Sequence, residues 1–211
     1  MPAYDVRVET AVLVPIKAFA AAKRRLEGAL STDQRDRLAR WTAERVLVAA
    51  GELPTYVVCD DETVALWAAA RGATVLREVG RGLNAAVDHA VRCITEAGHR
   101  HVVVVHGDLP RPAPLGRFSS PATITLVPDR HDDGTNLMSF PLDTPIAAAY
   151  GPGSFRRHLA EAMATGTTTT VIHDPLMALD LDHPHDLRHP LVKEVLPEWL
   201  RTNPVNQQSP R

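Results

Sequence analysis

The order of apolar and polar residues along the chain predicts alternating strands and helices. The continuous apolar β-branched run over residues 101–105 is typical of a strand covered on both faces, and strands are also expected over residues 10–16 and 55–59. Shorter strands are expected over residues 73–76, 122–127, 137–140 and 167–172. Apolar residues recur at helical spacing over residues 32–50, 62–70, 84–97 and 154–164, and a broken helix is expected over 185–199. This alternation predicts an α/β fold, a three-layer Rossmann-like arrangement around a mostly parallel sheet.

The ends of these elements carry recognisable signals. Ser31, Thr32 and Asp33 are cap candidates for the helix over 32–50, which Gly51 would end, and Ser154 is the expected N-cap of the helix over 154–164. Residues 111–121 are rich in Pro, Gly and Ser and are expected to form a loop with little helix. We expect one domain over residues 1–201, followed by a polar, disordered tail over 202–211.

Composition narrows the function classes. The 211 residues carry a formal net charge of -2, which gives no support for a nucleic-acid partner. Cys59 and Cys93 lie apart in apolar runs, as buried thiols of a reduced protein do. No apolar stretch has the length of a membrane span, and no signal peptide is recognisable. A cytoplasmic protein without a membrane partner is therefore expected, while the sequence leaves open whether it forms a homodimer.

Two acidic motifs suggest a site for a metal-bound nucleotide. Asp108 stands in the run HGDLP directly after the strand over 101–105, and ligands of open parallel sheets bind beyond the carboxyl ends of the strands. In the run LDLDHP, Asp180 and Asp182 alternate with leucines, so both carboxylates share one face of an extended segment. Carboxylates in these positions are suited to a divalent cation on a phosphate.

Basic and glycine-rich segments would bind the anionic parts of the ligands. Lys17, Lys23, Arg24 and Arg25 follow the first strand, where a triphosphate would need counter-charges, although a solvated basic loop has the same composition. The run GRGLN over residues 80–84 precedes a helix, and its glycines would let a base or phosphate approach the backbone, or would form an ordinary tight turn.

Two further motifs suggest a pocket for a small anion. The run DDGTN over residues 132–136 has the composition of a hairpin turn, and Thr135 and Asn136 directly after it could donate hydrogen bonds to an anion. The run YGPGSFRRH over residues 150–158 combines two glycines, the cap candidate Ser154 and two arginines at the start of a helix. Free N–H groups, a hydroxyl and cations are suited to a phosphate or a carboxylate.

The order of these motifs resembles the 2-phospho-L-lactate guanylyltransferase family, which includes the phosphoenolpyruvate guanylyltransferases of deazaflavin (F-420) coenzyme biosynthesis. LVPIK, AK, RL, GLN, GDLP, GTN, YGPGSFRRH and DLDHP carry the resemblance, over residues 12–187. GDLP and PIK occur in many nucleotidyltransferases, whereas GTN together with YGxGSFxxH is specific to this family. The resemblance implies a GT-A-like nucleotidyltransferase fold and transfer of GMP from GTP to a small phosphorylated three-carbon acid, such as 2-phospho-L-lactate, phosphoenolpyruvate or 3-phosphoglycerate.

The resemblance also implies roles for individual residues. Asp108, Asp180 and Asp182 would hold Mg²⁺, and Lys17, Lys23 and Arg25 would contact the nucleotide phosphates. Gly82, Leu83 and Asn84 would lie by the guanine pocket, and Thr135, Gly151 and Ser154 would hold the acceptor. Two departures concern the acceptor side of the site, namely the proline-rich segment after GDLP, where the family has a helix, and His183, where the family has Thr.

Other functions fit parts of the same pattern. A nucleotidyltransferase of the same fold with another base or acceptor would share the acidic motifs. A non-catalytic module that binds GTP or a phospho-acid would have lost at least one metal carboxylate, yet all three are present. A glycosyltransferase would place a DxD motif after a central strand, where this chain has the single Asp108.

Overall fold

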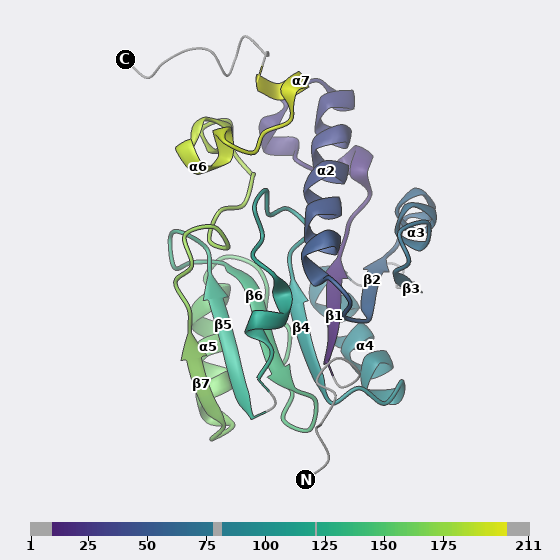
Figure 1. The fold of residues 1–211 in the computed structure, drawn as a ribbon. Coiled ribbons are helices and arrows are strands. Elements are labelled where there is room, and N and C mark those ends of the chain that lie inside the picture. The colour runs from purple at the N-terminus through teal and green to yellow at the C-terminus, as the bar shows by residue number, and fades with distance from the viewer. Residues whose placement is uncertain (1–9, 78–81, 121, 202–211) are drawn as a thin grey trace.

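The computed structural model describes residues 10–77, 82–120 and 122–201. Seven strands form one sheet in the order β3-β2-β1-β4-β6-β5-β7 (Figure 1). Their bounds are β1 Thr10–Pro15, β2 Thr55–Cys59, β3 Thr74–Arg77, β4 His101–Val105, β5 Thr123–Pro128, β6 Thr135–Pro141 and β7 Thr168–Val171. Only β6 runs antiparallel to its neighbours among these strands, so the expected mostly parallel sheet is confirmed.

Helices cover both faces of the sheet, as the three-layer prediction requires (Figure 1). Alternate residues of β1 enter different cores, because successive side chains of a strand point to opposite faces. Val12 and Val14 pack with α2 and α3 on one face, and Ala11 and Leu13 pack with α4 and α5 on the other. The helix bounds are α2 Thr32–Ala50, α3 Glu62–Ala69, α4 Gly82–Glu96 and α5 Ser154–Ala164.

The C-terminal segment is fragmented, as the sequence predicts. Its described helices are the short α6 Pro190–Lys193 and α7 Glu198–Arg201, with a 3-10 turn over Asp186–Arg188. Their apolar residues form a third core around Leu26, Leu38 and Leu181. This core also includes the N-terminal part of α2 and the end of the basic loop over residues 17–26. Residues 111–121 contain only the 3-10 turn Leu115–Phe118 among the described positions, which agrees with the expected loop.

The two expected N-caps had different outcomes. Ser31 caps α2 in a capping box, because its hydroxyl accepts from Gln34 N–H and the Gln34 side chain accepts from Ser31 N–H. The prediction that Ser154 caps α5 was wrong. Gly153 takes that position with φ of 71°, a left-handed conformation that glycine adopts without steric cost, and Ser154 is the first helical residue.

Some predictions lie outside the described residues. These are Gly80 and Arg81 of the GRGLN run and the polar tail over residues 202–211. In the part of the chain that the structure covers, no helix is both long and apolar enough to span a bilayer.

Candidate active site

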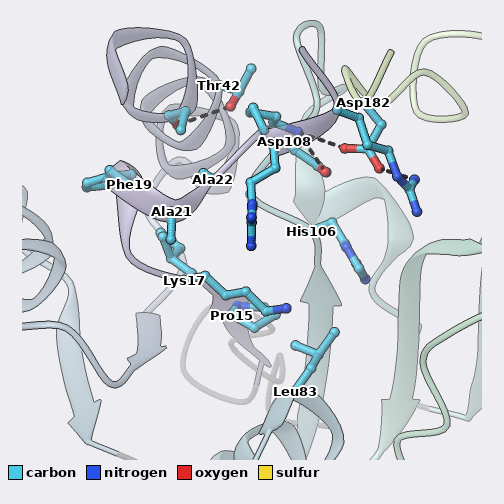
Figure 2. A pocket seen from close by; sticks show the side chains of 16 residues that line it. Pro15, Lys17, Phe19, Ala21, Ala22, Thr42, Leu83, His106, Asp108 and Asp182 are labelled. Carbon is cyan, nitrogen blue, oxygen red and sulfur yellow. Dashed lines mark hydrogen bonds and ion pairs between the residues drawn. The ribbon is translucent and has the colours of Figure 1, made fainter. Parts of the chain in front are cut away.

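A pocket of about 390 Å³ opens at the carboxyl ends of β1 and β4 (Figure 2). In the sheet, β2 lies on one side of β1 and β4 on the other. The strand order therefore reverses between β1 and β4, where the pocket opens. The pocket brings together distant segments of the sequence. Its lining includes Lys17, Lys23, Arg24 and Arg25 of the basic loop, Leu83 at the start of α4, His106 and Asp108 after β4, and Asp182.

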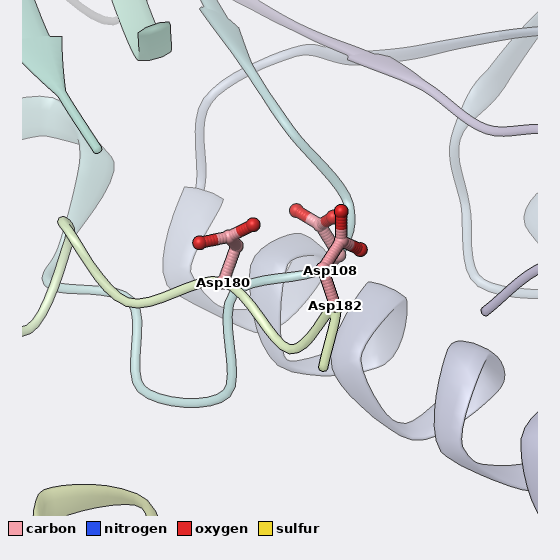
Figure 3. A group of neighbouring side chains, drawn as sticks. All are labelled: Asp108, Asp180 and Asp182. Carbon is pink, nitrogen blue, oxygen red and sulfur yellow. The ribbon is translucent and has the colours of Figure 1, made fainter. Parts of the chain in front are cut away.

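The three predicted metal ligands meet beside this pocket. Asp108, Asp180 and Asp182 each place a carboxylate oxygen within 4.8 Å of the others (Figure 3). The alternation in LDLD explains the orientation, because Leu179 and Leu181 are buried in the third core and the intervening aspartates point away from it. The second oxygen of Asp108 is buried and has no hydrogen-bond partner among the described residues. Hard oxygen ligands with such an unsatisfied buried atom fit a divalent cation.

Lys23 reaches into the carboxylates from the basic loop. Its side chain is only 6% exposed, and Nζ lies 3.0 Å from Asp108 Oδ2 and 3.3 Å from Asp182 Oδ1. The Lys23 backbone is left-handed, with φ of 56° and ψ of 35°, which costs about 1 kcal/mol for a residue with a Cβ. Strain of this kind persists where the surroundings impose it, and it is concentrated at functional sites.

The protonation of this cluster follows from its charges. Burial alone lowers the pKa of Lys23, but Asp108 and Asp182 more than offset it, so the pKa lies above its usual value. Burial would raise the pKa of Asp108, but the charge and hydrogen bond of Lys23 and the charge of His106 together hold this pKa below its usual value. For Asp180, burial and then the charges of Asp108 and Asp182 raise the pKa to about 7. The charges of Asp108 and Asp182 thus oppose ionisation of Asp180, and a cation bound among the three carboxylates would relieve this repulsion.

The other residues predicted to contact the nucleotide differ in their exposure and in their hydrogen-bond partners. Lys17 lines it from an exposed position, and Arg25, 66% exposed at its side chain, lies 3.2 Å from Asp182 Oδ2. Leu83 lines the wall of the pocket that faces Asp108 and Asp182 (Figure 2). Asn84 is engaged elsewhere, because its amide accepts from Tyr150 N–H at 2.7 Å and donates to Tyr150 C=O at 3.3 Å. Asn84 thus ties α4 to the YGPGS segment.

The predicted acceptor segment is built differently from the expected cradle of free N–H groups and arginines. The Gly153 and Phe155 N–H groups both donate to Asp133, to its side chain and its carbonyl respectively. The Arg157 guanidinium donates to the carbonyls of Ala149, Gly151 and Pro152. These hydrogen bonds fix the loop between β6 and α5, so its shape is formed before any ligand binds.

A buried histidine sets the hydrogen-bonding role of Thr135. The Ala149 N–H donates to His158 Nε2 at 2.9 Å, so this nitrogen carries no proton. Burial, followed by the charge of Arg157, lowers the pKa of His158 to about 4, and the neutral ring must carry its proton on Nδ1. Nδ1 lies 2.9 Å from Thr135 Oγ1 and therefore donates to it, which leaves the Thr135 hydroxyl hydrogen to point to another acceptor. Asn136, by contrast, donates to Met177 C=O at 2.9 Å.

Sequence reasoning missed His106 and Tyr150, which connect the pocket to the YGPGS segment. His106 lines the pocket, and its ring meets Tyr150 edge to face at 4.8 Å between centroids, while Tyr150 meets His158 at 5.0 Å. His106 Nε2 and the Tyr150 hydroxyl are buried without partners in the described part of the chain. A single His or Tyr beside a motif gave no signal, because its packing depends on strands far apart in the sequence.

Comparison with known proteins identifies the family. The family model described as guanylyl transferase, CofC like, matches residues 10–194. The chain belongs to this family. The phosphoenolpyruvate guanylyltransferase of Chloroflexus aggregans is 33% identical over 84% of this chain and 94% of its own length. That of Conexibacter woesei is 32% identical over 94% of this chain and 100% of its own. This member of the CofC-like family is therefore an enzyme, a nucleotidyltransferase.

Solved structures confirm the expected nucleotidyltransferase fold. A nucleotide-diphospho-sugar transferase from Desulfovibrio desulfuricans G20 superposes with a TM-score of 0.73 at 16% identity, covering 94% of this chain and 92% of that one. A 4-diphosphocytidyl-2C-methyl-D-erythritol synthase superposes with a TM-score of 0.57 at 17% identity, covering 90% and 98%. At these identities the similarity concerns the fold alone.

Buried titratable groups predict how stability depends on pH in metal-free buffer. Burial lowers the pKa of His101 and His158 to about 4 and also lowers that of His106, so below pH about 6.5 the unfolded chain binds protons at these three histidines that the native state does not. Asp180 opposes them with one proton, because its raised pKa of about 7 keeps it protonated in the native state. The melting temperature is expected to fall by several degrees as pH decreases from 6.5 to 4.5, measured by calorimetry with a chelator present.

Variants separate these opposing contributions. Asp180→Asn should steepen the loss of stability on acidification, and His158→Gln should make it shallower. Equal slopes for the wild type and both variants would show that these groups do not titrate as their surroundings imply.

Proposed function

We propose that this protein transfers GMP from GTP to phosphoenolpyruvate or a closely similar phosphorylated three-carbon acid, with release of pyrophosphate, in deazaflavin coenzyme biosynthesis. The observation that carries the proposal is the convergence of Asp108, Asp180 and Asp182 within 4.8 Å, next to a basic pocket at the reversal point of the sheet. The choice of GTP and of phosphoenolpyruvate is supported by the names of the relatives.

The reaction needs positioning and charge stabilisation more than a strong base. The acceptor phosphate already carries an ionised oxygen, which attacks the α-phosphorus of GTP while the bond to the β-phosphate breaks and pyrophosphate leaves. Lys17, Lys23 and Arg25 would hold the triphosphate and stabilise the charge of the leaving group. Mg²⁺, held by the three aspartates, would supply further charge neutralisation on the phosphates.

The acceptor would be held on the side of β6 and α5. Thr135 offers a hydroxyl whose hydrogen is directed away from His158, and Ser154 would offer a second hydroxyl at the first position of α5. Both residues start elements whose positions are fixed by Asp133 and Arg157. This geometry suits a small acid with a carboxylate and a phosphate.

The deciding experiment measures magnesium-dependent pyrophosphate release. GTP, ATP, CTP and UTP are each paired with phosphoenolpyruvate, 2-phospho-L-lactate and 3-phosphoglycerate. We expect release with GTP and phosphoenolpyruvate, and mass spectrometry of a diphosphate-linked GMP adduct identifies the product. Release from another nucleotide, or no release from GTP with any of the acids, would overturn the proposal.

Removing one hydroxyl should separate acceptor binding from nucleotide binding. Ser154→Ala is expected to raise the KM for phosphoenolpyruvate roughly tenfold, since a hydrogen bond to a charged group contributes about 1.5 kcal/mol or more. The KM for GTP should change less than twofold. Ser119→Ala is the matched control, because that hydroxyl bonds Thr10 at the far end of β1. Equal effects of Ser154→Ala on both substrates would show that the acceptor position is misassigned.

A further inference from the structure

A fourth aspartate, Asp186, holds the backbone of the segment that carries Asp180 and Asp182. It is 1% exposed, and its Oδ2 accepts from Asp182 N–H at 2.9 Å and from His183 N–H at 2.6 Å. A carboxylate that accepts two backbone N–H groups fixes the turn containing them. The direction of the Asp182 side chain therefore depends on Asp186, although Asp186 is absent from the carboxylate cluster described above.

The other oxygen of Asp186 is anchored to a different element. Oδ1 accepts from Arg130 Nη2 at 2.5 Å, and the same nitrogen lies 2.9 Å from His185 Nε2. Arg130 follows β5, and its own N–H donates to Ala178 C=O at 3.0 Å. The Arg130 guanidinium thus joins the β5–β6 hairpin to the segment over residues 180–186 at two points, His185 and Asp186.

The same hairpin leads into the proposed acceptor position. Asp129 accepts from the N–H groups of His131, Asp133 and Gly134, and β6 then begins with Thr135. These hydrogen bonds hold the turn of the hairpin in one conformation, and Arg130 and Asp186 connect the hairpin to the backbone of Asp182.

We propose that Asp186 and Arg130 are positioning residues for the divalent-cation site: Asp186 fixes Asp182, and Arg130 holds Asp186 on the hairpin that carries Thr135. The pair touches neither substrate and acts through the geometry of Asp182. The proposal rests on the metal site of the proposed function. Outer partners of metal ligands of this kind change metal affinity by about 10- to 100-fold when they are replaced.

The test measures Mn²⁺ binding directly, by electron paramagnetic resonance, with and without GTP. Asp186→Asn keeps an oxygen for the backbone N–H groups but places an amide against Arg130, and Arg130→Met removes the guanidinium from the other side. Each is expected to weaken Mn²⁺ binding roughly tenfold. The double variant should bind Mn²⁺ no more weakly than the single variants, because both substitutions break the same connection between Asp182 and the hairpin.

The chain offers a matched control in Asp174. It also accepts from two backbone N–H groups, of Leu176 and Met177, and it also pairs with an arginine, Arg117. Asp174→Asn should lower the melting temperature but leave the dissociation constant for Mn²⁺ within twofold of that of the wild type.

The outcomes separate this inference from the function on which it rests. Mn²⁺ affinities within twofold of the wild type in folded Arg130→Met would overturn the inference and leave the metal site standing, as would additive losses in the double variant. A wild-type protein that binds no Mn²⁺ with GTP present would overturn the proposed function as well. If Asp186→Asn does not fold, Arg130→Met decides alone, since its guanidinium is partly exposed.

Discussion

Asp108→Asn is expected to lower turnover by at least about 1000-fold, the largest effect of any single substitution considered for this enzyme. The change keeps the shape of the side chain but removes one charge from the three that converge beside the pocket. It also replaces the carboxylate that accepts from Lys23 Nζ at 3.0 Å by a neutral amide, so the ammonium loses its closest charged partner. The rate of pyrophosphate release from GTP and phosphoenolpyruvate measures the loss.

A matched carboxylate controls for charge alone. Asp60 follows β2 as Asp108 follows β4, but it is exposed and does not line the pocket. Asp60→Asn should retain turnover within twofold. Turnover of Asp108→Asn within tenfold of the wild type, in a protein that melts normally, would refute the metal assignment.

Lys23→Met is expected to lower turnover without weakening cation binding. Turnover should fall at least about 100-fold, because a desolvated ammonium no longer stabilises the charge that develops on the phosphates. Binding of Mn²⁺ alone should be unchanged or tighter, because the ammonium competes for the oxygens of Asp108 and Asp182. Steady-state kinetics and a Mn²⁺ titration of the same preparation measure the two effects.

Two further variants make this result specific. Lys23→Arg keeps the charge, but its larger planar group does not fit the buried position of a point charge, so turnover should still fall. Lys193→Met removes an exposed lysine in α6 and should change neither quantity. Weaker Mn²⁺ binding in Lys23→Met would show that Lys23 supports the cation site instead of competing for it.

The strands and helices with strong local signals could be predicted from the sequence. The runs over 55–59 and 101–105 match β2 and β4 at both ends, because buried β-branched residues have no competing pattern. The helix over 32–50 matches α2 because Ser31 and Gly51 close it. The antiparallel pairing of β6 with β5 follows from the hairpin composition of DDGTN, whereas the pairing of β6 with β4 could not be predicted, since no local pattern names the second neighbour of a strand.

The candidate site shows where local reasoning ends. The pocket position of Asp108 follows from its place after a buried strand. The two acidic motifs together suggest one metal site, and the family resemblance then implies Asp108, Asp180 and Asp182 as its ligands. The inward direction of Lys23 depends on a left-handed backbone that its residue type does not favour. The engagement of Asn84 with Tyr150 depends on a contact across 66 residues of sequence, for which no local signal exists.

The reversed strand β6 bears on how such an enzyme can change over evolution. Because β6 pairs antiparallel with β4, the tight turn before Thr135 projects from the same edge of the sheet as Asp108. Lengthening a surface turn costs little, about 0.6 kcal/mol for each doubling of its length, whereas β1 and β4 are enclosed by both cores. Insertions and deletions beyond Arg130 in this turn can therefore reshape the proposed acceptor side while the buried strands stay intact, and new acceptor preferences should arise there first.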